Sequence, residues 1–467
     1  MKKYIISNET EVTEKNVQTW LDKFTSNIQP HLQYLDKFYQ GEDEIISYPY
    51  EKREVNSQIH VNLAYMTVQN IVSYCFGKEP TQDYHKDFKH GKYIDELKFK
   101  NNEILEDKAL ESDCSRLGLA YEFVGVRETK NGKKEPFYKR IDPFTTFLVV
   151  DDSILEEEIC YITYSIVVPD NEAEYKKGFI YKKGEIIEFN NKNGNVRFIK
   201  TEQNTAYPDD FPIVMYKNND NNFGDYEPAC PILSAYSKTY SLGMDDFSGI
   251  ANAILAFFNV DLPDEEREKL NRTRVVSLMG ENSDAKYIYK KLDSSSFKAL
   301  QEALRGEYYA ITNVPDFTDL ASYNKSGQAI AFKMIGIENI RLNKSAYFEQ
   351  GMRKRWNIIA SYVGNKFEIG KDDMEYQFYN NLPNNVSADL EYADLVDKGL
   401  MSKETAMRKM ETITDVEGEL ARIEAEQKSR VLNALEEISG VNITKNNSNS
   451  NSNSNKENSD PAYPFTM

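Results

Sequence analysis

The feature that most constrains this fold is a pair of very long helical patterns in the second half of the chain. In the first, residues 226–258, apolar residues recur at three- and four-residue steps. At about 1.5 Å per residue, a helix of this length would be on the order of 50 Å long. The second begins after Ser326-Gly327 and continues to Gly364. Both spread their apolar residues over more than one stripe, so we expect burial between several neighbours, including copies of the same chain.

A short insertion, residues 261–293, follows the first pattern. It mixes charged residues with brief β-rich runs, so we expect a compact helix-plus-strand unit there. After it, residues 296–311 predict another helix, which ends before Pro315 because the residue preceding a proline resists helical geometry. Gly336 lies inside the second long pattern with no other helix breaker nearby, and it predicts a bend.

The first half of the chain changes its hydrophobic period once. Residues 10–115 show helical periodicity, with turns at Gln40-Gly41 and at Gly77 to Pro80. From Gly118 the period becomes two, and Asn-Gly and Lys-Gly pairs separate some of the runs. The β-rich runs are 119–126, 137–141, 145–150, 159–168, 179–182, 186–189 and 196–200. We therefore expect an antiparallel β meander after a helical start, and an α+β fold.

The C-terminal part returns to a helical, highly charged pattern over residues 387–438. Ser402 is suited to cap a helix N-terminus, and a long surface helix is expected to follow Asp415. Residues 446–455 are nearly all Asn and Ser. Such a tract cannot bury a core, so we expect the tail to be disordered.

Size and charge narrow the functional classes. With 467 residues, the chain should divide into two to four lobes. Its 75 Asp and Glu exceed its 57 Lys and Arg, which gives a formal charge of −18. Proteins that grip nucleic acid by its phosphates are usually basic, so ordinary DNA binding is disfavoured. A negative net charge would instead suit a surface along which DNA slides without being held.

The compartment is predicted from cysteines and hydropathy. Cys75, Cys114, Cys160 and Cys230 are widely separated, and we expect buried thiols in a reducing compartment rather than disulfides or a metal site. Polar residues interrupt the N-terminus too early for a signal peptide. No run approaches about 18 apolar residues, so no membrane span is expected. A soluble cytoplasmic product is the simplest interpretation.

No pattern in the chain predicts catalysis. The phosphate-binding motif of P-loop ATPases is missing from the sequence, and the histidines have no metal-ligand spacing: His31, His60, His85 and His90. We therefore expect no catalytic residue, cofactor or metal. The paired acids Asp245-Asp246 lie midway along the first long pattern. They predict either a solvated helix face or an acidic ring facing a channel, if rods from many subunits stand side by side.

Two basic features contrast with the acidic balance of the chain. The insertion carries a positive patch, which predicts either a solvated helix face or a docking surface for an acidic protein: Arg267, Lys269, Arg272 and Arg274. Lys325 lies in the polar loop that precedes the second long pattern, with Ser322, Tyr323, Asn324 and Ser326. A lone exposed lysine usually has no role, but this loop must project from where two helices meet.

Several short segments, in fixed order over residues 30–435, carry a family resemblance. They are Phe38-Tyr39-Gln40-Gly41, residues 70–80, Ile141-Asp142-Pro143, Phe211-Pro212-Ile213-Val214 with Asn218-Asn219, Val314-Pro315-Asp316-Phe317, Ser326-Gly327-Gln328-Ala329-Ile330, Ser402-Lys403-Glu404-Thr405 and residues 415–420. Together they resemble the portal proteins of tailed bacteriophages, specifically of long-tailed siphophages that infect Gram-positive hosts.

The resemblance implies a division of the chain into the parts of a portal subunit. These are a wing (1–225), a stem helix (226–258), a clip (259–295), a second stem helix with the Pro-Asp segment (296–319), a tunnel loop (320–327), a long bent helix with the return to the wing (328–386), a helical crown (387–440) and a disordered tail (441–467). It also implies that residues 322–326 narrow the channel, that Asp245 and Asp246 face it, and that the basic patch of the insertion docks partners.

The implied function is a dodecameric channel at one capsid vertex, through which double-stranded DNA is packaged and later ejected. Implied partners are the large terminase, head-completion adaptors, scaffold and major capsid proteins, and the DNA itself, with no membrane. The location would be the virion, and the host cytoplasm during assembly. Two other classes stay open: a nuclease-like packaging enzyme, which needs a carboxylate cluster with a nearby lysine, and a monomeric capsid adaptor.

Overall fold

The structure is a computed structural model, which describes most of the chain. The described residues are 2–42, 57–85, 88–169, 173–251, 254–259, 284–288, 294–318, 327–362, 369–370, 373–381, 386–410, 413 and 416–439. The chain divides into two compact units, Met1–Asn381 and Leu382–Met467. As the sequence predicted, the fold mixes helices with mainly antiparallel sheets.

The larger sheet has six strands in the order β1-β5-β6-β7-β8-β9. Their bounds are Ile5–Ser7, Thr146–Asp151, Glu158–Val167, Tyr175–Lys182, Glu185–Asn190 and Arg197–Gln203. Strands β5 to β9 pair antiparallel in chain order, which confirms the predicted meander for this stretch. Gly184 and Gly194 take positive φ in the connecting turns. Strand β1 was not predicted, and it adds in parallel beside β5.

The first two β-rich runs do not belong to this meander. Strands β3 (Leu119–Glu128) and β4 (Lys134–Ile141) form a separate three-stranded sheet with β10 (Ile213–Lys217). The prediction of a single meander is therefore wrong. The two sheets pack against each other through a second hydrophobic cluster, in which Leu148 and Val150 of β5 meet Leu119 and Tyr121 of β3. Alternation along β5 sends every second side chain into this layer.

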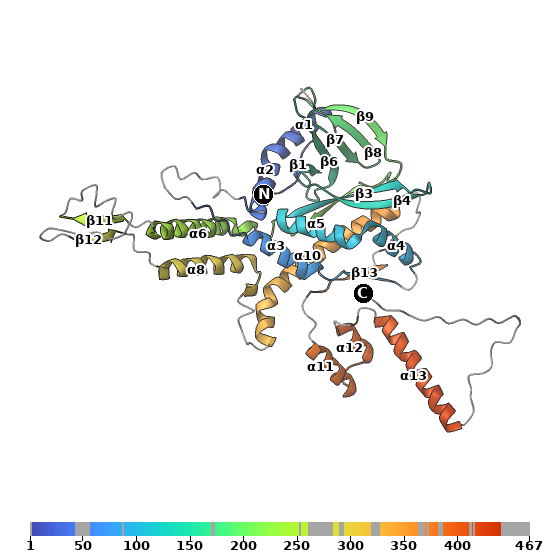
Figure 1. Cartoon of the computed structure of the whole chain (residues 1–467). Coiled ribbons are helices and arrows are strands. Elements are labelled where there is room, and N and C mark those ends of the chain that lie inside the picture. The colour runs from blue at the N-terminus through green and yellow to red at the C-terminus, as the bar shows by residue number, and fades with distance from the viewer. Residues whose placement is uncertain are drawn as a thin grey trace, which may run out of the picture. The chain divides into compact units, whose positions relative to one another are not determined.

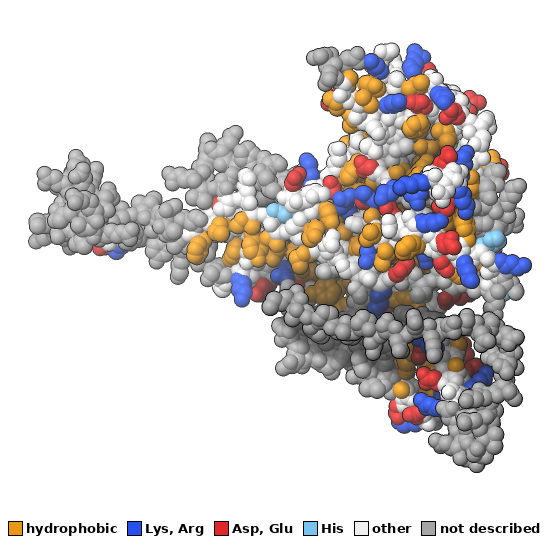
Figure 2. All heavy atoms as spheres, turned by 45° about the vertical axis from the view of Figure 1, so that its right-hand side comes forward, with side chains coloured by type: hydrophobic (Ala, Val, Ile, Leu, Met, Phe, Trp, Pro, Cys, Tyr) orange, Lys and Arg blue, Asp and Glu red, His pale blue; other side chains and the backbone are white. Residues whose placement is uncertain are grey.

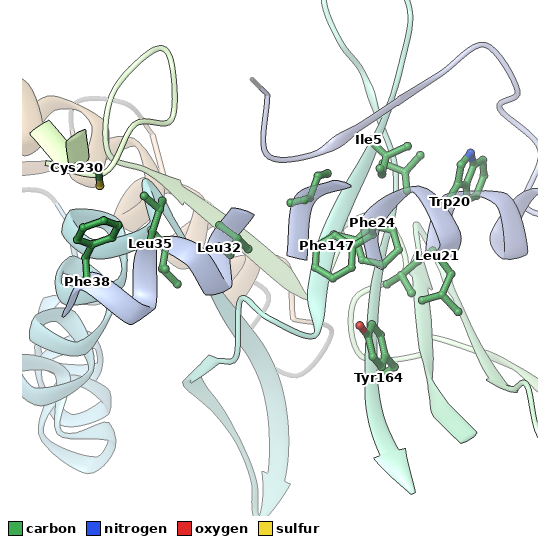
Figure 3. Packing of buried hydrophobic residues seen from close by; sticks show 14 of the residues in the cluster. Ile5, Trp20, Leu21, Phe24, Leu32, Leu35, Phe38, Phe147, Tyr164 and Cys230 are labelled. Atoms are coloured by element: carbon green, nitrogen blue, oxygen red, sulfur yellow. The ribbon is translucent and has the colours of Figure 1, made fainter. Parts of the chain in front are cut away.

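The opposite face of the six-stranded sheet is covered by the first helices. These are α1 (Glu14–Lys23) and the π-helical turn η1 (Phe24–Ile28), and α2 (Gln29–Gln40) continues from them onto the helices of residues 63–76 and 103–117. In Figure 3, Phe24 lies flat against Phe147 of β5, with ring centroids 4.4 Å apart, and Tyr164 meets Phe24 edge-on. This cluster extends to Cys230, and so the main core reaches the start of the next long helix.

Three further helices complete the N-terminal part, as the helical periodicity predicted. They are α3 (Leu63–Phe76), α4 (Gly91–Asn101) and α5 (Glu103–Leu117). The residue Gly118, with φ of +85°, ends α5 and lets the chain turn into β3. A small antiparallel ribbon of β2 (Thr81–Tyr84) and β13 (Met374–Gln377) was not predicted, because its strands lie far apart in the sequence.

The first long pattern is not one continuous helix. A short 3-10 turn, η2 (Glu227–Ala229), leads into α6 (Cys230–Ala251), and the chain then forms strand β11 (Ile254–Phe258). The predicted helix over 226–258 is therefore wrong at both ends. Periodicity alone does not separate a short apolar run in a strand from one in a helix. Here pairing with β12 (Asp284–Ile288) decides, and that strand lies near the far end of the insertion, about 30 residues along the chain.

Helix α8 (Ser294–Thr312) packs beside α6, as Figure 1 shows. The β11–β12 ribbon lies between these two helices in the sequence. The predicted helix over 296–311 is thus confirmed. The second long pattern is also confirmed, as the 35-residue helix α10 (Gly327–Ser361). It packs on β10 and α3.

The second unit contains three described helices, α11 (Val386–Asp397), α12 (Lys403–Lys409) and α13 (Val416–Ser439). Neighbouring helices contact each other in chain order. Ser402 caps α12 as predicted, since its side chain accepts a hydrogen bond from the Thr405 amide. The Asn and Ser tract of the tail lies outside the described residues.

Candidate functional site: the α6–α8 helix pair and its anchors

The helices α6 and α8, called the helix pair below, pack very closely at one point. A Cβ atom added at Gly243 of α6 would lie 2.0 Å from the Phe297 ring of α8. Only a glycine therefore lets this ring sit on the α6 backbone. Farther along α8, Tyr308 is buried in the main core. One end of the helix pair is thus part of the core, and the Gly243–Phe297 contact holds the two helices together nearer the β11–β12 ribbon.

A short segment, residues 57–61, runs antiparallel along α6 and is called the strap. Three of its backbone amides donate to side chains on one face of the helix: Ser57 N to Asp245 Oδ1 (2.7 Å), Ile59 N to Ser241 Oγ (2.9 Å) and Val61 N to Ser237 Oγ (3.3 Å). The three acceptors, called the ladder, are spaced four residues apart. Such spacing places them on one side of a helix.

The strap leads directly into α3. Asn62 caps that helix by accepting from the Tyr65 amide at 2.8 Å, and its amide nitrogen donates to the Tyr39 carbonyl of α2 at 2.8 Å. In the first turn of α3, the Leu63 carbonyl accepts from the Tyr308 hydroxyl of α8 at 3.1 Å. Both members of the helix pair are therefore tied to the start of α3, one through the strap and one through a tyrosine.

The end of α8 is held by an ion pair. Asn313 takes positive φ directly after the helix, the geometry in which helices often end. Arg305 then donates through two nitrogens to the Asp316 carboxylate, at 2.7 and 3.0 Å. Partial burial of Asp316 acts to raise its pKa, but the Arg305 guanidinium and the Thr318 hydroxyl outweigh it, and the pKa is lowered overall. The turn before residue 319 is thus fixed onto α8.

Gly336 of α10 contacts this same turn. A Cβ atom there would lie 2.5 Å from the Asn313 carbonyl oxygen. Because that oxygen belongs to the backbone, it cannot move aside as a side chain would. The glycine is thus required for the close approach of α8's end to α10. The bend predicted at Gly336 stays a prediction.

The other end of α10 is anchored by a buried arginine that the sequence did not lead us to expect. Arg355 is fully buried and donates to three carboxylates: Glu122 at 2.7 Å, Asp107 at 2.6 Å and Glu103 at 3.0 Å. Its guanidinium also lies 4.4 Å from the centroid of the Tyr138 ring. Burial, together with the neighbouring Asp107 carboxylate, raises the pKa of Glu103 to about 7.

A second buried cation, Lys344, lies eleven residues earlier on α10, which is about three helical turns. Its ammonium group contacts Glu111 at 2.6 Å and Asp225 at 2.9 Å. Glu111 follows Glu103 and Asp107 at four-residue steps on α5, so one acidic stripe faces both cations. The signal was present in the sequence, because Lys344 and Arg355 fall in register with the apolar positions Phe348, Met352 and Ile359.

Large apolar side chains are exposed on the helix pair and on the first half of α10. Phe247 of α6 is 65% exposed, and Phe332 of α10 is 74% exposed. Among the side chains that the structure describes on these helices, the other exposed large apolar ones are Met244, Leu300, Ile311, Ile335 and Leu342. Figure 2 shows hydrophobic side chains gathered over the helix pair. These helices therefore keep apolar faces that the single chain does not cover.

The predicted site residues differ in how far the structure describes them. The loop residues Ser322, Tyr323, Asn324, Lys325 and Ser326 and the basic patch Arg267, Lys269, Arg272 and Arg274 lie outside the described residues. Asp246 lies on α6, and only its backbone is described. Asp245 is buried at 8% exposure, bonded to the strap. Its carboxylate therefore does not lie on a solvated face of the protomer, and the predicted position on a channel wall stays a prediction.

The remaining candidate chemistry concerns thiols, metals and membranes. All four cysteines are free and buried, as predicted. Among the described residues, no group of three or more His, Cys, Asp or Glu side chains is arranged to hold a metal ion. The described helices include none that is long and apolar enough to cross a membrane.

Comparison with known proteins gives one decisive finding. The family model described as "Phage portal protein, SPP1 Gp6-like" matches residues 21–431. No curated protein sequence matches the chain. Among solved structures, it is similar to chains from the neck of an empty gene transfer agent particle and from the virion of a native one. Each of these is 13% identical, with a TM-score of 0.45, and the match covers 73% of this chain and 87% of that chain.

The family match spans most of the chain, from α1 in the first unit to α13 in the second. The family is one of structural proteins without catalytic activity. This agrees with the sequence, in which no catalytic motif was found. The protein therefore belongs to the phage portal protein family of the SPP1 Gp6 type.

Proposed function

We propose that the protein forms a ring of about 12 copies at one capsid vertex and that double-stranded DNA passes through the ring during packaging and ejection. The observation that carries the proposal is the family match over residues 21–431. The helix pair would be the stem, with the chain between β11 and β12 as the clip. The first unit otherwise supplies the wing, and the second unit the crown. The tunnel loop would be residues 320–327.

The apolar faces of the helix pair and of α10 support assembly. Burying the exposed side chain of Phe247 or Phe332 in a subunit contact would stabilise the assembly by roughly 25 cal/mol per Å² of apolar surface removed from water. Large contiguous apolar patches on soluble proteins usually mark interaction sites. Sister copies arranged around an axis would cover these faces, which accounts for their being left open in the single chain.

The charge of the chain supports a conduit rather than a DNA-gripping protein. A formal charge of −18 repels a polyanion, whereas a continuous basic groove would trap it. In this proposal, Lys325 supplies one of the few basic contacts with DNA. Asp246 would contribute to the acidic wall of the channel.

Partners follow from the same assignment. The large terminase would dock at the clip during packaging and head-completion adaptors would dock there afterwards, with contacts from Arg267, Lys269, Arg272 and Arg274. Scaffold and major capsid proteins would surround the wing. The ring would assemble in the host cytoplasm and remain in the virion.

Native mass spectrometry and negative-stain imaging of the purified full-length protein test this proposal. We expect a closed ring of about 12 copies with a central opening wide enough for duplex DNA. A stable monomer would contradict the proposal and favour a capsid adaptor. Metal-dependent cleavage of DNA by the purified protein would instead favour a packaging enzyme.

A further inference from the structure

We propose that Ser237, Ser241 and Asp245 are positioning residues that hold the strap along α6 and thereby fix the stem helix to α3, and that the Asp245 carboxylate serves this contact rather than the channel wall. The second half of this statement rests on the proposed function, since only a ring has a channel. The first half concerns the protomer and stands without it.

The geometry of the ladder matches an extended chain. Along α6, four residues rise by about 6.0 Å. In an extended chain, alternate residues are about 6.6–6.8 Å apart, and their amides point the same way. The two repeats therefore stay in step over the three bonds at Ser57, Ile59 and Val61. A single hydrogen bond would be an incidental contact, whereas three in register define a built track.

Burial shows that the ladder serves the protein interior. Ser237, Ser241 and Asp245 are all buried, whereas Lys238 on the adjoining side of α6 is exposed. Backbone amides placed against a helix lack the partners that a sheet provides, and an unsatisfied buried amide is costly. Side-chain acceptors on α6 meet this need. Ser241 also donates to the Ser237 carbonyl at 3.0 Å, which fixes its rotamer.

The strap joins stem and wing because it continues without a break into α3. Asn62, the residue after Val61, caps α3, and the first turn of that helix receives the hydroxyl of Tyr308 from α8. Tyr308 also bonds to Thr67 within the core. Movement of α6 relative to α8 is therefore resisted at the start of α3 as well as at the Gly243–Phe297 contact.

Two substitutions at Asp245 separate an acceptor from a charge. Asp245→Asn keeps an oxygen that can accept from the Ser57 amide but removes the negative charge. Asp245→Ala removes both. If the residue positions the strap, the asparagine variant should retain most of the protection of the strap amide and the alanine variant should not. A wall carboxylate would show the reverse dependence, because its charge and not its hydrogen bond would matter.

The measurement is hydrogen exchange of peptides that cover residues 57–62 in the purified full-length protein. In Asp245→Ala we expect exchange of the Ser57 amide to accelerate about tenfold or more, because a bond to a charged acceptor is lost. In Ser241→Ala the Ile59 amide should accelerate about fivefold. In Asp245→Asn, which keeps a neutral acceptor, the acceleration should be only about threefold, and in the control Lys238→Ala exchange should stay within about twofold of wild type.

Each outcome decides one part of the proposal. Unchanged strap exchange in Asp245→Ala would overturn it. So would Asp245→Asn virions that package less DNA while strap exchange stays normal, because the charge would then face the DNA. A wild-type protein that forms no ring would contradict the proposed function, yet the exchange data would still decide whether the ladder holds the strap.

Discussion

At the scale of single residues, the side chain of Arg355 anchors α10 against α5 and β3. It is fully buried and donates to three carboxylates from α5 and β3. A buried charge pays a large desolvation cost, which the surrounding opposite charges offset only while all partners are present. The group is therefore sensitive to the loss of any one member.

Arg355→Met should lower the free energy of unfolding by about 3–5 kcal/mol, because the carboxylates would be left buried without their cation. Urea or thermal unfolding measures this. The matched control is Arg197→Met, which removes a largely exposed arginine paired with Glu14, and it should cost no more than about 1 kcal/mol. Equal losses in both variants would contradict the assignment of Arg355 as an anchor.

The carboxyl group of Glu103 in the same cluster should make the stability of the folded protein depend on pH. Its pKa in the folded protein is about 7, above an unfolded value near 4.3. A carboxyl group with a raised folded pKa binds its proton more tightly in the folded state. Its contribution to stability is therefore complete below the unfolded pKa and is lost as pH rises through about 7.

Glu103→Gln keeps the shape of the side chain and removes this titration. The wild type should lose stability relative to the variant as pH rises from about 5 to about 8, by at most about 1.4 kcal/mol per pH unit. Urea unfolding midpoints of both proteins across this range provide the measurement. A difference that stays constant with pH would show that Glu103 does not titrate there.

At the scale of elements, the helix pair depends on a glycine contact. Gly243→Ala places a methyl group against the Phe297 ring, whereas Gly306→Ala on α8 meets nothing within 4 Å. Both changes bring the same gain in helix propensity. Gly243→Ala should therefore be less stable than Gly306→Ala by about 1–3 kcal/mol, the cost of overpacking. Thermal unfolding of the two variants measures the difference, and equal stabilities would show that Phe297 moves aside freely.

Gly336→Val tests the contact between α10 and the end of α8. The new side chain would meet the Asn313 carbonyl, and the turn that carries Asp316 would be displaced. We expect a lower yield of assembled rings, measured by native mass spectrometry, with the helix content of the chain retained. Normal ring yield from this variant would mean that the close approach is not needed for assembly.

At the scale of the whole molecule, the prediction concerns DNA. Lys325→Ala should leave ring assembly intact and modestly reduce the DNA packaged or retained in the virion, because one basic contact in an acidic channel would be lost. The DNA content of virions assembled with the variant measures this. Failure of the variant to form rings would place Lys325 in a subunit contact instead.

Local patterns predicted the elements well. The seven β-rich runs, the helix over residues 296–311 and the long helix after Gly327 all formed, because period and turn residues act over a few neighbouring positions. Pairings between distant segments were missed. Strand β11 was included in a helix, since its partner β12 lies near the far end of the insertion, and β3 and β4 joined β10 instead of the meander.

The candidate site divides in the same way. The sequence singled out residues by their place in a helical pattern, such as Asp245 midway along α6 and Gly336 inside α10. The contacts that these residues make could not be predicted from the sequence. Asp245 accepts a hydrogen bond from the strap, residues 57–61, and Gly336 lies against the carbonyl group of Asn313. A sequence reports which groups lie on one helix face, and it does not report which distant backbone will meet that face.

The sequence by itself determined the mixed helix and sheet class, the long helix pattern of α10 and the resemblance to portal proteins, since each depends on periodicity or on motifs in fixed order. Only the tertiary structure decided which carboxylates Arg355 and Lys344 meet, that two sheets form rather than one, and that Asp245 is bonded to a strap. Burial and pairing join residues separated by up to hundreds of positions, and their energies depend on the completed packing rather than on local order.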